Sequence, residues 1–434
     1  MLFTPKQLSN IGGGERVLSL ISNELSRKYD VTIITPYNDD SYYKLTPSVT
    51  VKSLGYSRSD ISIIRKFQFF SILLSMRAIV NKLEFDYFIA FASLGVILTS
   101  FLSIKNDNRF MCWIHTSYYQ PVPYLYKKYF LYILKYFSNV IILNKLDSQL
   151  FAPYANKVTV IPNPLSFNAV IKSDLREKRI VSVGRLEKNK GFDCLINICT
   201  CVFELHNDWR LDIYGQDDGE RENLERLIKE KGMQNNIEIH SAVSDITSIY
   251  ISSSIFAFTS LFESFGLVLI EANECGLPCV CFNSPSGIKD LVIDGYNGYL
   301  IEQFDNRTFE ERILQLIESY DLRLFMSQNA LNNANKYRNE KLPEAEAEAD
   351  QIIQDAEAQK QVRINEAEAE VARFNAMYEE YVKNPEITKK RMFYETMEDV
   401  LPGMKIVIDN GDGVQKVLPL DSFTGNSSEN PTET

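Results

Sequence analysis

The sequence has little of what usually marks a disulfide framework or a metal site. Seven cysteines occur in 434 residues, an odd count whose spacing shows no paired zinc pattern. Histidine (three) and tryptophan (two) are also scarce, and the acidic pairs at 39–40 and 217–218 lie in polar turns, without a D-x-D motif beside a strand. These shortages exclude a zinc-finger or disulfide-rich protein and favour a reducing compartment, the cytoplasm.

Export and membrane segments are not evident either. Met1–Thr4 is strand-like, with no basic flank before an apolar core, so we expect no signal peptide. Tyr87–Ile104 has no charged residue and is long enough to raise the question of a membrane span. Because Ser93-Leu94-Gly95 interrupts it, we predict a buried strand at 87–92 followed by a helix, with a membrane span as the alternative.

Charge is unevenly distributed along the chain. Residues 343–434 hold 20 acidic and 9 basic side chains, whereas residues 1–342 hold 37 of each sign. All the Cys, His and Trp residues also precede residue 343. The change in composition indicates two joined segments, either a natural fusion or a chimera.

One stretch, Thr259–Cys275, combines a strand end, a turn and a helix. The apolar run Ile255–Phe258 before it is typical of a buried strand, and a helical apolar pattern begins at Leu267. Glu263 therefore lies at the turn and Glu271 inside the helix. A helix that begins here aims free N–H groups at an anion, and two carboxylates frame the site. The plainer alternative is a helix cap with a surface glutamate.

Glu263 and Glu271, with Ser264, Phe265 and Gly266 between them, resemble the E-x7-E signature of the family 4 retaining glycosyltransferases. In that family the first Glu contacts hydroxyls of the donor sugar and the second binds the nucleotide ribose. The amides between them approach the sugar and the diphosphate. The resemblance implies a catalytic-site role for Glu263 and donor binding by Ser264, Phe265, Gly266, Leu267 and Glu271.

Two loops of the first half resemble the same family. Gly12-Gly13-Gly14 follows the first strand and opens a helix that we predict to run to about Tyr29. In the family this loop covers the donor phosphates, which implies that Gly13 and Gly14 bind donor; a flexible turn is the alternative. His115, at the end of the predicted strand Arg109–His115, matches a His that lines the reaction centre, although a lone His is usually structural.

The second half adds two more motifs. Gly184–Asp193 resembles a family segment whose cations grip the donor diphosphate, which implies that Arg185 and Lys190 do so here. Fixed cations can stabilise the leaving diphosphate without a metal, so we expect neither metal nor cofactor. Solvated loop charges are the alternative. Asp294–Leu300 resembles the family's D-G-x-N-G-x-L turn.

The resemblance covers about residues 1–337 and implies an α/β protein with the GT-B fold, two Rossmann-like doubly wound domains that face a cleft. Strands predicted at Val31–Thr35 and Val49–Leu54 alternate with helices, which independently favours a parallel sheet. We predict an acceptor-side domain at 1–162, a nucleotide-sugar-binding domain at 163–337 and a helical tail at 338–434. The Pro-rich stretch Ile161–Pro164 would be a stiff link between the domains.

Tyr337–Pro343, the Glu/Ala-rich run that follows it and the stretch Pro385–Pro402 resemble a different family, the C-terminal part of an HflK-type subunit of the band-7 (SPFH, prohibitin-like) group. Pro343–Lys383 is rich in helix formers, and its apolar residues follow 4-3 spacing in two pieces joined by a stutter, so we predict a long coiled-coil-like helix that self-associates. The strands Met404–Ile408 and Val417–Leu420 would form a hairpin about Asn410–Gly413. Gly425–Thr434 is predicted to be disordered.

Together these resemblances imply retaining, metal-independent transfer of a hexose from a nucleotide sugar, expected to be a UDP-sugar. The acceptor would be a surface polysaccharide or a lipid-linked glycan, and we expect no nucleic-acid partner. Aromatic and basic residues at Tyr118–Phe137 suit either a peripheral contact with the cytoplasmic face of the inner membrane or ordinary packing. An alternative function is a non-catalytic assembly protein that oligomerises through its tail. Glycoside hydrolysis is disfavoured, because it needs two carboxylates that face each other across the sugar.

Overall fold

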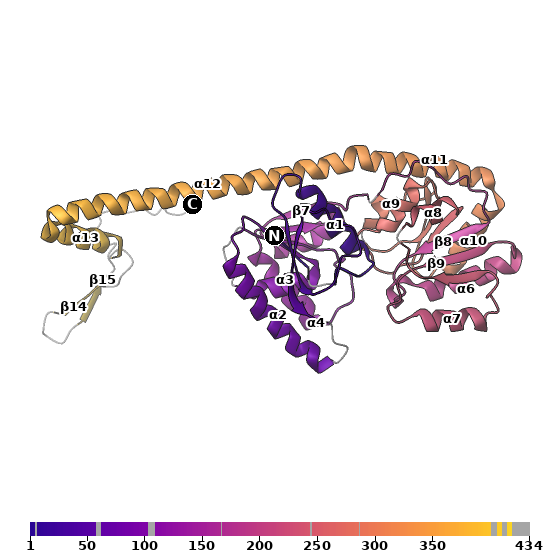
Figure 1. Ribbon diagram of the computed structural model, residues 1–434, viewed down its shortest axis with the longest axis horizontal. Helices are drawn as coiled ribbons and strands as arrows, with labels where there is room; N and C mark the ends of the chain where they lie inside the picture. Colours follow the sequence, from indigo (N-terminus) through magenta and orange to yellow (C-terminus); the bar gives the residue numbers. More distant parts are fainter. Residues whose placement is uncertain are drawn as a thin grey trace, which may run out of the picture. The chain divides into compact units, whose positions relative to one another are not determined.

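The computed structural model describes residues 1–4, 7–57, 62–102, 109–165, 167–243, 245–285, 287–400, 406–409 and 415–418. The chain divides into two compact units, Met1–Ile353 and Gln354–Thr434, and each is described by itself. The first unit contains two sheet-based domains, which Figure 1 shows in indigo to purple and in magenta to orange. The first sheet ends at Val160 and the second begins at Arg179, on either side of the predicted link.

The N-terminal domain is built on a seven-stranded, wholly parallel sheet with the order β3-β2-β1-β4-β5-β6-β7. Its central strands Leu2–Phe3, Phe88–Phe91 and Phe110–Trp113 are continuous apolar runs, because a parallel sheet is covered by helices on both faces. Its strands are β1 (Leu2–Phe3), β2 (Thr32–Tyr37), β3 (Thr50–Tyr56), β4 (Phe88–Phe91), β5 (Phe110–Trp113), β6 (Asn139–Ile142) and β7 (Val158–Val160). Its helices are α1 (Gly13–Leu25), α2 (Ser62–Lys82), α3 (Ala92–Ser100), α4 (Tyr124–Ile133) and α5 (Lys145–Phe151).

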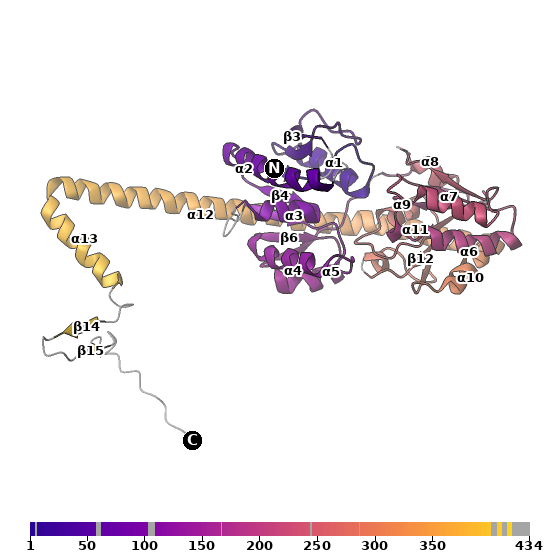
Figure 2. The same ribbon diagram turned by 90° about the horizontal axis from the view of Figure 1, so that it is seen from below.

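The second domain repeats the same topology in a six-stranded parallel sheet with the order β10-β9-β8-β11-β12-β13. Its strands are β8 (Arg179–Val183), β9 (Arg210–Tyr214), β10 (Ile237–His240), β11 (Ile255–Phe258), β12 (Cys279–Phe282) and β13 (Gly298–Ile301). Its helices are α6 (Phe192–Leu205), α7 (Arg221–Glu230), α8 (Thr247–Ile251), α9 (Leu267–Glu274), α10 (Asn306–Glu318) and α11 (Tyr320–Lys336), with α11 packed against α9 (Figures 1 and 2). Both sheets have the Rossmann strand order, which confirms the predicted pair of doubly wound domains.

The predicted end of the first helix is wrong by about one turn. The first helix ends at Leu25, not near Tyr29, because the chain turns at residues 26–29 with backbone amides bonded back to Leu25 and its neighbours. The aromatic helix α4 begins at Tyr124, directly after Pro121 and Pro123, which do not continue a helix. The uncharged run after Tyr87 divides into β4 and α3, as predicted. In the described part of the chain, no helix is both long and apolar enough to cross a membrane.

The end of the first unit is anchored to the link between the domains. A five-residue π-helix, η5 (Tyr337–Lys341), follows α11 and continues into α12 (Leu342–Lys383). The buried Tyr337 hydroxyl donates a hydrogen bond of 2.5 Å to the carbonyl oxygen of Asn163. Arg338 forms an ion pair with the buried carboxylate of Glu274. The chain is therefore packed on the core up to residue 338, one residue beyond the predicted boundary at 337.

The second unit contains the rest of α12, the helix α13 (Pro385–Val400) and a two-stranded antiparallel sheet of β14 (Ile406–Asp409) and β15 (Gln415–Leu418). Arg391 on α13 and Glu380 on α12 form an ion pair at 3.2 Å, which links the two helices. The helix α12 and the antiparallel pairing of β14 with β15 agree with the predicted long helix and the predicted pair of strands, although β15 begins two residues before the predicted Val417. The predicted turn at Asn410–Gly413 and the predicted disorder at Gly425–Thr434 lie outside the described residues.

Candidate active site

A cleft of about 480 Å³ lies between the two domains of the first unit. In a doubly wound sheet, ligands bind at the carboxyl ends of the strands where the strand order reverses. The reversal lies between β1 and β4 in the first sheet and between β8 and β11 in the second. Loop and first-turn helix residues that follow all four strands line the cleft: Ile11–Arg16, Ala92–Leu94, Gly184–Arg185 and Phe262–Leu267. The topology therefore brings the two reversal points into one site.

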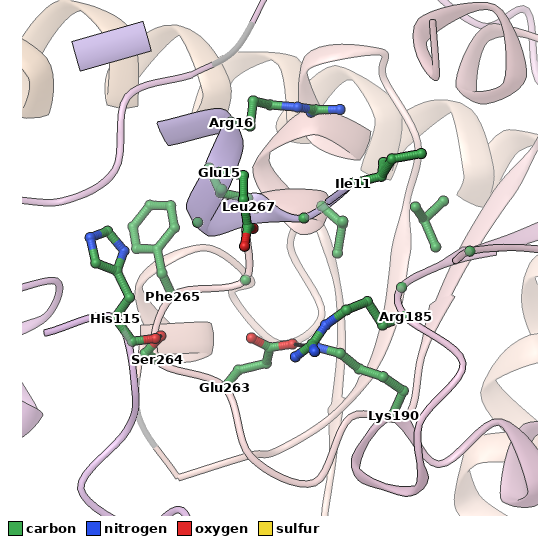
Figure 3. Close-up of a pocket in the computed structure, with 18 of the residues that line it drawn as sticks. Ile11, Glu15, Arg16, His115, Arg185, Lys190, Glu263, Ser264, Phe265 and Leu267 are labelled. Carbon is green, nitrogen blue, oxygen red and sulfur yellow. Dashed lines mark hydrogen bonds and ion pairs between the residues drawn. The ribbon is translucent and has the colours of Figure 1, made fainter. Parts of the chain in front are cut away.

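All the predicted site residues line this cleft. They comprise two glycines of the first loop, one histidine, two cations and six residues of the E-x7-E stretch: Gly13, Gly14, His115, Arg185, Lys190, Glu263, Ser264, Phe265, Gly266, Leu267 and Glu271. Figure 3 shows Glu263, Arg185 and Lys190 at one wall, with His115 and Ser264 together at another. The structure thus places these residues around one cavity, while their individual roles stay predictions.

Lys190 and Glu263 form an ion pair within the second domain. The loop that carries Lys190 is held against the end of β11, because the Thr259 hydroxyl donates to the carbonyl oxygens of Lys190 and Gly191 at 3.0 and 2.9 Å. Gly191 has a φ of +64°, and a Cβ on it would lie 2.5 Å from the Thr259 carbonyl oxygen. A glycine is required there, and it places Lys190 beside Glu263.

Arg185 lies at the open side of the same wall. Its guanidinium contacts Glu187 at 3.0 Å and Asp218 at 3.1 Å, and its side chain is 45% exposed. Ion pairs this exposed contribute little to stability and are readily exchanged for another anion. Arg185 is therefore available to a phosphate group that enters the cleft.

Two hydrogen bonds join the turn before α9 to the N-terminal domain. The Ser264 hydroxyl donates to the carbonyl oxygen of His115 at 2.8 Å, and the Asn144 amide donates to the carbonyl oxygen of Ser264 at 2.7 Å. Gly266 precedes α9 in the left-handed conformation, with φ +82°, and no side chain caps the helix. The start of α9 is therefore uncapped by a side chain, and residues 266–268 line the cleft, which suits an anion site.

His115 lies two residues after β5, which ends at Trp113 and not at His115 as predicted, and its ring lies in an aromatic cluster. The ring centroid is 4.1 Å from that of Phe91 and 5.4 Å from that of Trp113. This packing fixes the imidazole at the wall of the cleft on the N-terminal side. The geometry is compatible with the predicted place at the reaction centre.

Glu271 forms an ion pair with a residue of the other domain across the cleft. This ion pair was not predicted from the sequence. The side chain is 2% exposed and forms an ion pair with Arg16 of α1, whose side chain is 19% exposed. The Tyr250 hydroxyl donates to the other carboxylate oxygen at 3.4 Å, and burial raises the pKa of Tyr250 well above its usual value. Arg16 also lies over the ring of Tyr43, 5.5 Å from its centroid. Arg16 lies two residues after the glycine triplet, and this position was the signal in the sequence that could have pointed to the ion pair.

The glycine loop makes close contact with the second domain. A Cβ on Gly13 would lie 3.2 Å from Leu267 Cδ1, and the amide of Ile11 donates to the Gln216 side chain at 3.1 Å. Glu15, in the first turn of α1, also lines the cleft and is buried. The loop thus lies over the start of α9, where the resemblance expects the donor phosphates.

His240, given no role from sequence, belongs to a small cluster with Asp212 and Glu238 at the edge of the second sheet. The Nε2 atom of His240 lies 3.3 Å from Asp212 and 3.8 Å from Glu238. Asp212 also forms a buried ion pair with Arg179 and lies 3.6 Å from Arg210. Because these cations already compensate the carboxylate, the cluster is explained as an ion-pair network of β8, β9 and β10.

Comparison with known proteins identifies a domain in this chain. Residues 166–333 match the family described as glycosyl transferases group 1. This segment contains β8 to β13 together with Arg185, Lys190 and the E-x7-E stretch. It is a group 1 glycosyltransferase domain, and the chain is a glycosyltransferase.

Individual relatives match over both domains. The amylovoran biosynthesis glycosyltransferase AmsD of Erwinia amylovora is 29% identical over 344 residues, which cover 76% of this chain and 93% of the relative. The GalNAc-alpha-(1->4)-GalNAc-alpha-(1->3)-diNAcBac-PP-undecaprenol alpha-1,4-N-acetyl-D-galactosaminyltransferase of Campylobacter jejuni is 24% identical, covering 74% and 90%.

The fold is shared with solved structures. Anabaena Alr3699/HepE, crystallised in complex with UDP and glucose, superposes with a TM-score of 0.66 at 17% identity, covering 81% of this chain and 99% of that one. At this identity the likeness shows the fold alone, and it confirms the predicted GT-B architecture.

Proposed function

We propose that this glycosyltransferase transfers a hexose, with retention of the anomeric configuration and without a metal, from a UDP-sugar to a growing surface glycan on a lipid carrier. The observation that carries the proposal is the joint placement of Arg185, Lys190, the amides of α9 and the two glutamates around one cleft. One relative named above is a glycosyltransferase of amylovoran biosynthesis, the other has an undecaprenol-linked glycan in its name, and HepE was crystallised with UDP and glucose, which supports the donor and acceptor classes.

The proposed chemistry follows from where negative charge develops. As the glycosidic bond to the diphosphate breaks, the leaving group gains charge that must be stabilised in the transition state. Arg185 and Lys190 supply fixed cations, and the first amides of α9 supply the positive end of a helix dipole. Glu263 would hold hydroxyls of the sugar, Glu271 the ribose, and His115 would line the reaction centre from the opposite domain.

A panel of UDP-, GDP- and ADP-sugars tests the donor, because a ligand that binds the folded protein raises its melting temperature. We expect a UDP-sugar to stabilise the chain more than the others, and the stabilisation to persist in EDTA. No shift with any nucleotide sugar would contradict the proposal. The anomeric configuration of the product, read by NMR, tests retention separately.

The acceptor-side domain carries an exposed apolar face that suits a membrane surface. On α4, Tyr124 is 75% and Leu125 is 77% exposed, and Lys128 lies beside them. On α3, Leu94 is both exposed and part of the cleft wall. We propose peripheral contact of this face with an anionic bilayer, on the cytoplasmic side, where a lipid-linked acceptor would be presented. Sedimentation with anionic vesicles tests it, and Leu125→Ser should reduce binding while Arg27→Met does not.

The tail supports a second, separate proposal, that the chain self-associates through residues 343–383. Val371, Phe374 and Tyr378 follow 4-3 spacing on α12, and Phe374 is 63% exposed. Such an apolar seam on a helix favours a partner helix. The resemblance of this segment to an HflK-type subunit stays part of the same proposal. Light scattering of the full chain tests it: a monomer at tens of micromolar would contradict self-association, and Phe374→Ser should dissociate an oligomer.

A further inference from the structure

The carboxylate proposed to bind the donor ribose is buried away from water. Glu271 lies one turn inside α9, and its side chain is 2% exposed. A carboxylate in such a place costs several kcal/mol unless a cation and hydrogen-bond donors compensate it. How this charge is compensated therefore decides how the ribose site works.

The compensating cation comes from the other domain. Arg16, in the first turns of α1, contacts Glu271 Oε1 across 255 residues of sequence. From its own domain Glu271 receives the Tyr250 hydroxyl, a neutral donor at 3.4 Å. A carboxylate has about four acceptor positions, so one carboxylate can accept hydrogen bonds from a guanidinium and from ribose hydroxyls at the same time. Arg16 and a ribose can thus contact the Glu271 carboxylate at the same time.

We propose that Arg16 is a positioning residue for the donor, which neutralises and orients Glu271 so that it can accept the ribose hydroxyls. This inference rests on the proposed function, in which Glu271 binds the ribose. It has a mechanistic consequence, because nucleotide recognition by the second domain then depends on a side chain of the first. Ribose binding is thereby coupled to the contact between the two domains.

The geometry favours arginine for this role. Its planar guanidinium has five N–H donors, so one edge can contact Glu271 while Tyr43 lies under its face. A lysine would keep the charge but lose the planar fork. Arg16→Lys should therefore retain part of the effect, and Arg16→Met should lose it while keeping the length of the side chain.

The competing explanation is that Arg16 only holds the two domains together, like a structural clamp. Arg16 is one of several contacts between the domains, together with Ile11 to Gln216 and Asn144 to Ser264. A clamp that only holds the domains together would affect every nucleotide equally. A positioning residue for Glu271 affects only ligands that carry ribose hydroxyls. Two ligands that differ in those hydroxyls therefore separate the two roles.

The experiment measures, by titration calorimetry, the binding of UDP and of 2′,3′-dideoxy-UDP to the full chain. Hydrogen bonds to a charged group contribute about 1.5–3 kcal/mol, so the wild type should prefer UDP by roughly tenfold to a hundredfold. Arg16→Met should abolish most of this preference by weakening UDP, with little change for the dideoxy ligand. Arg16→Lys should lie between them. Arg27→Met, just beyond the same helix in an exposed pair with Glu24, is the matched control and should leave both affinities unchanged.

The outcomes are distinguishable. Equal weakening of both ligands in Arg16→Met, or an unchanged preference in a variant that melts like the wild type, would overturn the role of Arg16 and leave the proposed function standing. A wild type that binds the two ligands equally would remove the ribose contact on which the inference depends. A wild type that binds neither would overturn the proposed function and the inference together.

Discussion

Lys190 and Glu263 neutralise each other inside the cleft. The first is the cation proposed for the donor diphosphate, and the second is the carboxylate proposed for the donor sugar. Their pairing keeps both charges compensated before a donor is bound, with side chains that are only 16% and 15% exposed. A donor diphosphate would take over Lys190 and release Glu263 toward the sugar hydroxyls. Binding and positioning of the two halves of the donor would thus be linked.

We predict that Lys190→Ala weakens UDP binding by about 1.5–3 kcal/mol, the range for a hydrogen bond to a charged group. Lys188→Ala is the control, because Lys188 lies in the same short turn, is exposed and does not line the cleft. Calorimetric titration with UDP measures both. An affinity that is unchanged in a folded Lys190→Ala protein would show that this lysine does not hold the diphosphate.

Substitutions of the two glutamates should differ in their effects on UDP affinity and on turnover. Glu271→Gln should lower the affinity for UDP itself, because the ribose loses a charged acceptor and Arg16 loses its ion pair. Glu263→Gln should bind UDP at least as well as the wild type, since Lys190 is released, but should lose turnover by roughly a hundredfold or more, the scale of one electrostatic group. Equal losses of UDP affinity in both variants would mean that the roles are wrongly divided.

Gly191→Ala should destabilise the fold more than a left-handed backbone alone explains. A non-glycine residue at positive φ costs roughly 1–2 kcal/mol, and the new Cβ would also lie 2.5 Å from the Thr259 carbonyl oxygen. Gly232→Ala is the matched control, because its φ is +69° with no atom within 4 Å of the added Cβ. Urea unfolding of both variants isolates the clash. Equal losses of stability would show that the loop of Lys190 shifts to remove the clash without a measurable loss of free energy of unfolding.

Truncation should locate the end of the catalytic unit. A chain that ends at residue 353 should melt like the full protein and bind UDP, because it keeps Tyr337 and Arg338. A chain that ends at Lys336 should be less stable, since Asn163, Phe265 and Glu274 lose their partners. Limited proteolysis should cut after 338. A shorter resistant fragment with full UDP binding would contradict this boundary.

A milder variant of the same contact removes one hydrogen bond. Tyr337→Phe keeps the ring against Phe265 but loses the hydroxyl that donates to Asn163. We expect a loss of about 0.5–1.5 kcal/mol in the free energy of unfolding, the usual net value of one hydrogen bond. Tyr320→Phe, which loses an exposed bond to Asp174, is the control and should cost less. Melting curves of the two proteins measure the difference.

Much of the fold and of the site could be predicted from local sequence. Strands such as Ile255–Phe258 are continuous apolar runs, which a buried parallel strand requires whatever its neighbours are. The glycines, cations and glutamates of the cleft stand at loops that follow such strands, so their place at the carboxyl edge followed from the alternation of strands and helices. Helix ends were less predictable, because the stop at Leu25 depends on a turn that no strong breaker marks.

The sequence by itself determined which residues border the cleft, because strand ends and loops are local properties. Only the tertiary structure decided which charges meet. Glu271 and Arg16 are 255 residues apart, and each has several oppositely charged residues nearer in sequence. The pair forms because two sheets with the same strand order place α1 and α9 on opposite walls, where a buried carboxylate must find a cation. Tyr337 reaches Asn163 for a similar reason: a buried carbonyl oxygen needs a donor, and the close packing of α11 on α9 brings the hydroxyl there.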